Sequence, residues 1–68
     1  MLDVKALKAE MVRYGYTQAT LAEEMGITPR TFSNKLKKGD FGCKEMEVMI
    51  VKLNLKDPIS IFFANKVT

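Results

Sequence analysis

Apolar residues recur along the chain at the three- and four-residue spacing that is typical of amphipathic helices. In the first segment this spacing is followed by Val4, Leu7, Met11 and Tyr14. Gly15 comes next and can end a helix in a left-handed turn. Two further stripes are Leu21, Ala22 and Met25, and Cys43, Met46, Ile50 and Leu53 with Met49 beside them. The spacing predicts that these residues face a common core.

Four helix starts can be located by their N-capping residues, which accept a hydrogen bond from the first helical turn. The candidate caps are Asp3, Thr17, Thr28 and Gly42. An apolar residue before each cap can pack against one at the fourth helical position; the pairs are Leu2–Leu7, Tyr16–Leu21, Ile27–Phe32 and Phe41–Met46. Pro29 strengthens the third start, because the first helical position needs no backbone N–H. The pattern therefore predicts four helices.

The C-terminal stretch from residue 55 onwards has two readings. Asp57 followed by Pro58 is a good helix start, whereas residues 59–63 are rich in strand formers. We favour a short fifth helix. The chain has no internal repeat, low-complexity tract or linker, so residues 1–68 are expected to form a single domain. The predicted fold class is all-α, a compact bundle of about five short helices.

The placement of charge adds a candidate surface to this picture. The net charge of the 68 residues is +3. Between Thr28 and Lys44, five cations oppose a single acid, Asp40, which makes a net charge of +4, while the rest of the chain carries six cations and seven acids. Such a concentration of positive charge is expected of a surface that faces a polyanion. The alternative is a solvated lysine-rich face without a partner.

Several classes of function find no support in the residues. The chain has no histidine and one cysteine, and it lacks a glycine-rich phosphate loop or a nucleophile beside a base. We therefore expect no enzyme activity, metal, cofactor or small-molecule substrate, and we interpret Cys43 as a small helix residue rather than a reactive thiol. The start does not resemble a signal peptide, and no apolar run approaches the roughly 20 residues that span a bilayer. We expect a cytoplasmic protein without a membrane partner.

A small residue and a glycine stand four positions apart in the middle of the chain. Ala22 is small enough for two helices to pass closely, and Gly26 suits a left-handed turn between them. The apolar joint would be formed by Leu21, Met25, Ile27 and Phe32. With these residues, the segment 17–38 resembles the helix-turn-helix of the phage lambda-type repressors and Cro proteins, especially short phage and prophage regulators. Lys35 stands where that family usually has an apolar residue, which here follows at Leu36, so we expect the third helix to run longer or to be rotated near its end.

The resemblance implies that the third helix enters the DNA major groove while the second crosses the backbone. The implied base contacts are Pro29, Arg30, Ser33 and Asn34. Arg30 has the fork that matches guanine O6 and N7, and Asn34 can pair with adenine. Pro29 can offer only an apolar contact, for instance to a thymine methyl. The implied backbone contacts are Thr17, Gln18, Thr31, Lys37, Lys38 and Lys44.

Most of these residues also have a purely structural interpretation. Thr17 and Thr28 cap helices whether or not they touch DNA. Lys37 and Lys38 favourably oppose the dipole at a helix C-terminus, and Asn34 can be an ordinary exposed residue. The DNA-reading hypothesis therefore depends most on Arg30.

Members of the resembled family usually act as dimers, because one recognition helix touches too few base pairs to select an operator. The candidate dimer surface is formed by the apolar residues of the fourth helix and of the tail 55–68, especially Leu55, Ile59, Phe62 and Phe63. The expected function is a repressor or Cro-like regulator that occupies an operator as a homodimer in the bacterial cytoplasm or nucleoid. The alternative is a protein-interaction module, antitoxin-like or otherwise partner-binding, that does not read DNA. The acidic Glu23 and Glu24 of the second helix suit that alternative.

Overall fold

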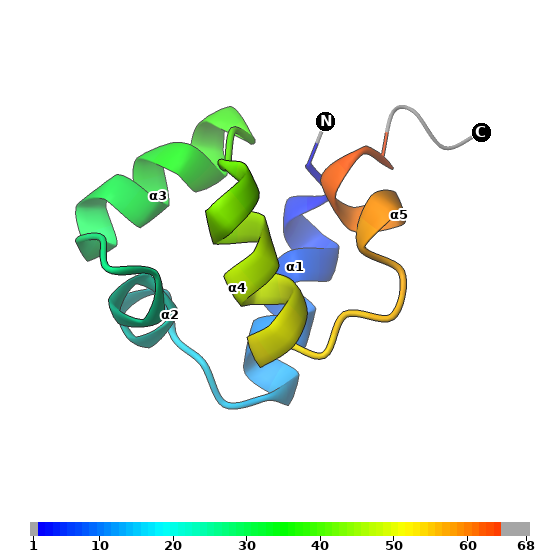
Figure 1. Ribbon diagram of the computed structural model, residues 1–68, viewed down its shortest axis with the longest axis horizontal. Coiled ribbons are helices and arrows are strands. Elements are labelled where there is room, and N and C mark those ends of the chain that lie inside the picture. The colour runs from blue at the N-terminus through cyan, green and yellow to red at the C-terminus, as the bar shows by residue number, and fades with distance from the viewer. Residues whose placement is uncertain (1, 65–68) are drawn as a thin grey trace.

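Five short helices follow one another in the computed structural model, which describes residues 2–64. They are α1 (Val4–Arg13), α2 (Gln18–Met25), α3 (Pro29–Lys38), α4 (Cys43–Lys52) and α5 (Pro58–Phe62). No strand occurs among the described residues, and the helices pack around one core (Figure 1). The predicted all-α class is therefore confirmed, and the C-terminal stretch contains a helix rather than a strand. Residues 65–68 of the predicted dimerisation tail lie outside the described residues.

The four predicted N-caps begin α1 to α4. The side chains of Asp3, Thr17 and Thr28 each accept a hydrogen bond from the backbone N–H three residues ahead, at 3.1 Å in all three cases. At Gly42 the direction is reversed, because the Glu45 carboxylate accepts from the Gly42 N–H at 2.8 Å. These bonds satisfy backbone donors that have no partner inside the helix. The helix boundaries therefore follow from local chemistry.

Two glycines set the ends of the central helices. Gly26 ends α2 with φ 74°, and Gly39 ends α3 with φ 67°, both in the left-handed region. Gly26 reverses the chain within a short connection. Helix α3 then begins at Pro29, immediately after its cap Thr28. A Cβ added at Gly26 would meet nothing within 4 Å, whereas one at Gly39 would lie 3.3 Å from Leu2 Cβ.

We expect both Gly26→Ala and Gly39→Ala to destabilise the fold, and Gly39→Ala to do so more. A left-handed conformation costs a residue with a Cβ roughly 1–2 kcal/mol. At Gly39 the new methyl would also press on Leu2, which is buried in the core. Urea unfolding of the two variants measures the difference. An equal loss of unfolding free energy in both would show that Leu2 yields without cost.

The core draws on every helix and on the loops between them. Its largest fully buried side chains are Leu7, Leu21, Phe32, Met49 and Leu53. The ring of Phe32 packs at a tilt against that of Phe41 in the α3–α4 loop, with ring centroids 5.5 Å apart. This arrangement anchors α3 by its inner face and leaves its outer face to solvent.

The predicted core stripes need correction at two places. Tyr14 was expected to face the core, but it stands at the end of α1 and is 42% exposed. Along α4 and its C-cap Leu53, Met49 and Leu53 are fully buried, Met46 and Ile50 are buried only in part, and Cys43 is exposed. The fourth helix carries apolar residues on more than one side, so spacing alone did not decide which side faces inward.

The last helix completes the core. It lies beside the start of α1, and the Asp3 N–H donates to the Ile61 carbonyl at 2.7 Å (Figure 1). Phe62 of α5 and Leu55 of the preceding loop are 7% and 8% exposed and belong to the same core as Leu2. The fold therefore uses part of the C-terminal apolar excess within the chain itself.

Candidate nucleic-acid interface

Helices α2 and α3 form the structural unit around the predicted site. They pack closely, and Leu21, Ala22 and Phe32 are fully buried where the chain brings them together. The Ile27 N–H donates to the Ala22 carbonyl at 3.0 Å and closes the turn after Gly26. The axes of α2 and α3 are far from parallel (Figure 1). The outer face of α3 is thereby presented on one side of the molecule.

The exposed side chains of α3 are arranged in rows along the helix. Arg30, Asn34 and Lys37 are spaced by four and three residues, so they share one face, and all three are exposed. Pro29 is exposed at the first helical position. Ser33 is half-buried, so its side chain is less accessible to a partner than those of the other predicted base contacts. The structure therefore groups Arg30 and Asn34 on an open surface.

The threonines of the site take part in caps. Thr17 forms a full capping box with Thr20, since the Thr17 N–H also donates to Thr20 Oγ1 at 2.8 Å. Thr28 donates its hydroxyl proton to Thr31 Oγ1 at 2.9 Å. The capping interpretation of Thr17 and Thr28 is therefore confirmed, while Thr17 and Thr31 remain exposed at the starts of α2 and α3. Gln18, the first residue of α2, is half-buried.

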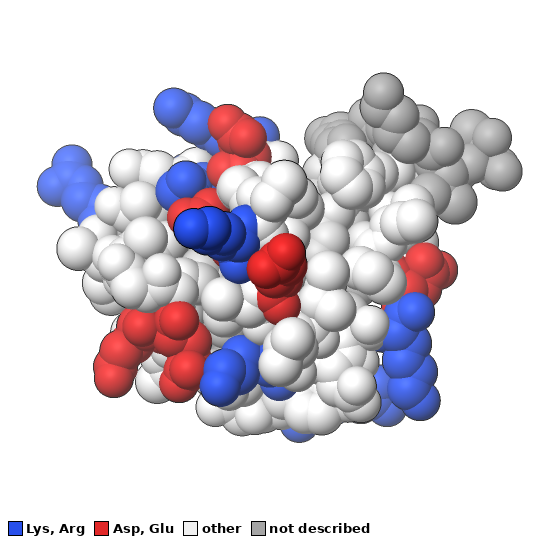
Figure 2. Space-filling model, viewed as in Figure 1, with Lys and Arg blue, Asp and Glu red and all other residues white. Residues whose placement is uncertain are grey.

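The positive segment is less uniform than its sequence suggested. Lys37, Lys38 and Lys44 are exposed, but Lys35 is half-buried and its Nζ lies 3.2 Å from Glu45 Oε1. Glu45 directly follows the Thr28–Lys44 segment in the sequence. In Figure 2 cationic groups gather around α3 and the start of α4 with acidic groups among them, and a separate acidic patch covers α2. The cationic surface is therefore real but locally neutralised.

One cation beside the site was missed from the sequence. Lys8 of α1 lines a hollow of about 310 Å³ together with Tyr16, Thr17 and Gln18. It is exposed and adds a positive charge next to the start of α2. No local pattern could have shown this, because Lys8 and Gln18 come to line the same hollow only when the chain is folded.

The four predicted dimer residues divide into two pairs. Leu55 and Phe62 are buried in the core of their own chain, so their selection was wrong. So small a fold needs them to cover its interior. Ile59 and Phe63 are 60% and 44% exposed and line a hollow of about 260 Å³ with Cys43 and other residues of α4. These two remain candidates for a contact between copies.

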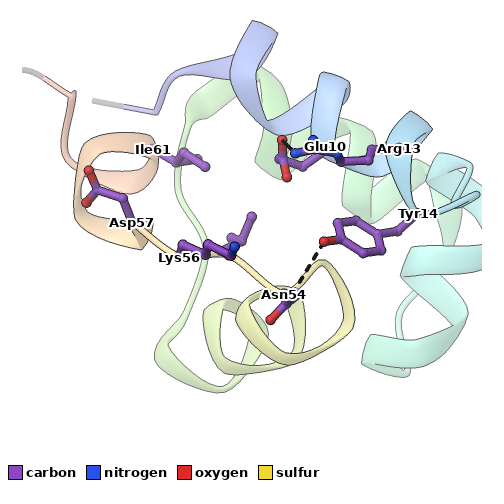
Figure 3. A pocket seen from close by; sticks show the side chains of 8 residues that line it. Glu10, Arg13, Tyr14, Asn54, Lys56, Asp57 and Ile61 are labelled. Carbon is purple, nitrogen blue, oxygen red and sulfur yellow. Dashed lines mark hydrogen bonds and ion pairs between the residues drawn. The ribbon is translucent and has the colours of Figure 1, made fainter.

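Another hollow, of about 400 Å³, lies between the end of α1 and the α4–α5 loop (Figure 3). Asn54 Nδ2 donates to the Tyr14 hydroxyl across it at 3.4 Å, and Arg13 pairs with Glu10 at 3.7 Å. Lys56 and Asp57 complete a lining of mixed charge. Leu55 is the one predicted site residue in this lining, so the hollow is not part of the α2–α3 surface.

Among the described residues, no three histidine, cysteine, aspartate or glutamate side chains are grouped so that they could hold a metal ion. No helix within residues 2–64 has the length and apolar character needed to cross a membrane. Comparison of the chain with protein-family models, curated proteins and solved structures finds no match.

Proposed function

We propose that the chain is a sequence-specific double-stranded DNA-binding transcriptional regulator. In this proposal α2 and α3 form a helix-turn-helix, and the protein occupies an operator as a dimer, like a phage repressor or Cro protein, in the bacterial cytoplasm or nucleoid. The observation that carries the proposal is the exposed row of Arg30, Asn34 and Lys37 on a helix whose opposite face is buried. A helix anchored in this way can enter the major groove as a rigid element.

Base reading is assigned to the first turns of α3. Arg30 can donate two hydrogen bonds to guanine O6 and N7, and Asn34 can pair with adenine N6 and N7. Pro29, exposed at the tip of α3, has no donor and offers an apolar contact to a thymine methyl. Ser33 is half-buried between these residues, so its short side chain contributes less to base reading than Arg30 and Asn34 do.

Phosphate contacts surround this row. Lys37, Lys38 and Lys44 are exposed near the end of α3 and the start of α4, and Lys8, Thr17, Gln18 and Thr31 are placed near the starts of α2 and α3. Such contacts orient a protein on the duplex without choosing a sequence. They also make affinity fall steeply as the salt concentration rises.

Selection of bound sequences from a random duplex pool tests the proposal directly. The expected result is an enriched motif with two-fold symmetry and half-sites about one helical turn, roughly 34 Å, apart. Enrichment of a single half-site would support base reading but contradict the proposed dimer. Failure to enrich any sequence would contradict sequence-specific binding.

The proposed dimer uses the exposed apolar residues near the C-terminal end of the described chain. We expect the unsubstituted protein to dimerise at high micromolar concentration and Ile59→Asp to be monomeric, because a charge would then have to be buried in the interface. Ile59 is 60% exposed, so the fold of one chain should survive. Sedimentation equilibrium measures the mass.

Val12→Asp is the matched control for this experiment. Val12 is 78% exposed on α1, so the substitution adds the same charge to an apolar surface position on another helix. It should leave the dimer intact. An unsubstituted protein that is monomeric both in solution and on DNA would exclude the proposed dimer.

A protein-interaction module is the second candidate, favoured by the acidic patch over α2 (Figure 2). Glu23 and Glu24 are both exposed there, and Glu24 pairs with Lys52 of α4 at 3.3 Å. Such a surface suits a basic partner better than a phosphate backbone. Charge reversal at Arg30 and Lys37 distinguishes the candidates, because it should abolish activity that depends on DNA and spare activity that depends on α2.

A further inference from the structure

Lys35 and Glu45 form an ion pair between α3 and the first turn of α4. The Lys35 Nζ lies 3.2 Å from Glu45 Oε1, and the two side chains are 34% and 16% exposed. A partly buried pair is screened less by water and salt than a pair on the open surface. By contrast, Arg30, Lys37 and Lys38 are exposed and form no salt bridge within residues 2–64.

The Glu45 carboxylate is itself held in place. The oxygen that meets Lys35 also accepts a hydrogen bond from the Gly42 N–H at 2.8 Å. Gly42 is the N-cap of α4, so this donor belongs to the backbone at the start of that helix. The carboxylate therefore moves with α4, and through it the ion pair joins α3 to α4.

The pair also relates to the outward face of α3. Lys35 follows Asn34 directly, so it points about 100° further around the helix. Burial of Phe32 and Leu36 places the row that contains Arg30 and Asn34 on the outer face. The Lys35–Glu45 pair limits how far α3 can rotate from that placement. A rotation of α3 about its own axis would break the ion pair and turn that row away.

We propose that Lys35 is a positioning residue that sets the rotation of α3 through Glu45 and thereby controls sequence specificity, without a phosphate contact of its own. This inference rests on the proposed DNA binding. It gives Lys35 a different role from the other cations of the Thr28–Lys44 segment, although all of them contribute equally to the net charge of that segment. Lys35 stabilises the orientation of the base-reading residues, whereas Lys37 contributes charge toward the backbone.

The test compares two duplexes: the one enriched by selection with the unsubstituted protein, and a scrambled duplex of the same composition. Affinities are measured over a series of salt concentrations for Lys35→Met, which removes the charge, and Lys35→Arg, which keeps it. Glu45→Gln is a second route to the same loss, because its amide oxygen can still accept from the Gly42 N–H. Lys37→Met is the matched control on the outward row.

Lys35→Met and Glu45→Gln are expected to lower the ratio of the two affinities roughly five-fold or more, the lower range of what one bidentate base contact contributes. Lys35→Met should leave the slope of log K against log salt on the scrambled duplex unchanged. Lys35→Arg should restore the ratio. Lys37→Met should instead preserve the ratio and reduce the slope by roughly 0.9.

Two outcomes would overturn the positioning role while leaving DNA binding in place. One is a slope reduced by Lys35→Met as much as by Lys37→Met, which would make Lys35 a phosphate contact. The other is an equal fall of both affinities, since a smaller folded fraction lowers both alike. If the unsubstituted protein enriches no sequence, the proposed function and this inference fail together.

Discussion

Phe32→Ala is expected to leave much of the protein unfolded at 37 °C. Phe32 is fully buried and packs against Phe41, with ring centroids 5.5 Å apart. Truncating a buried phenylalanine to alanine costs about 3–5 kcal/mol. At typical values per residue, a chain of this length has a total stability of only roughly 3–10 kcal/mol. A single cavity beneath α3 can therefore remove most of it.

Thermal and urea unfolding followed by circular dichroism measure this effect. Val12→Ala is the control, because Val12 is 78% exposed and its truncation should change the free energy of unfolding by no more than about 0.5 kcal/mol. DNA binding by Phe32→Ala should fall in proportion to its folded fraction. An unfolding midpoint close to that of the unsubstituted protein would mean that the side chains under α3 fill the cavity without a loss of stability.

Arg30→Ala is expected to cause the largest loss of sequence recognition. The removed side chain is exposed, so the fold should be unaffected. A good bidentate contact to guanine gives about 1–3 kcal/mol of discrimination, which corresponds to roughly a 5- to 150-fold weaker complex with the selected duplex. The selection experiment should also lose its guanine preference at the matching position of each half-site.

Lys38→Ala serves as the control for a cation that is proposed to contact only the DNA backbone. Lys38 is exposed near the end of the same helix, and its removal should weaken binding to all sequences alike. It should also reduce the salt slope by roughly 0.9. If Arg30→Ala behaves in the same way, with equal losses on selected and scrambled duplexes, then Arg30 does not read bases.

These experiments separate three roles that one helix combines. Phe32 anchors α3 to the core, Lys35 is proposed to set its rotation, and Arg30 is proposed to read the base pair. Their substitutions should differ in what they change: stability for Phe32, the specificity ratio without a change in salt slope for Lys35, and base preference for Arg30. The same purified proteins and duplexes can be used for all three comparisons.

The helix boundaries could be predicted from the sequence because capping is local. A cap such as Asp3, Thr17 or Thr28 bonds to a backbone group three residues away, so its partner is known as soon as the cap is found. The left-handed turns predicted at Gly15 and Gly26 follow from a property of one residue. The exposure of Arg30 and Asn34 likewise follows from the helical repeat, once Phe32 and Leu36 are placed inside.

The remaining features depend on which segments meet in space. Met49 rather than Cys43 faces the core, because the packing of α4 selected one of several apolar sides. Phe62 is buried in the core of its own chain and not in a contact with a second copy, because α5 lies against the start of α1. Lys35 pairs with Glu45 for the same reason. The sequence alone determined the helices and their caps, because capping contacts lie within a single turn. The tertiary structure decided which apolar and charged side chains became partners, because those contacts join segments far apart in the chain.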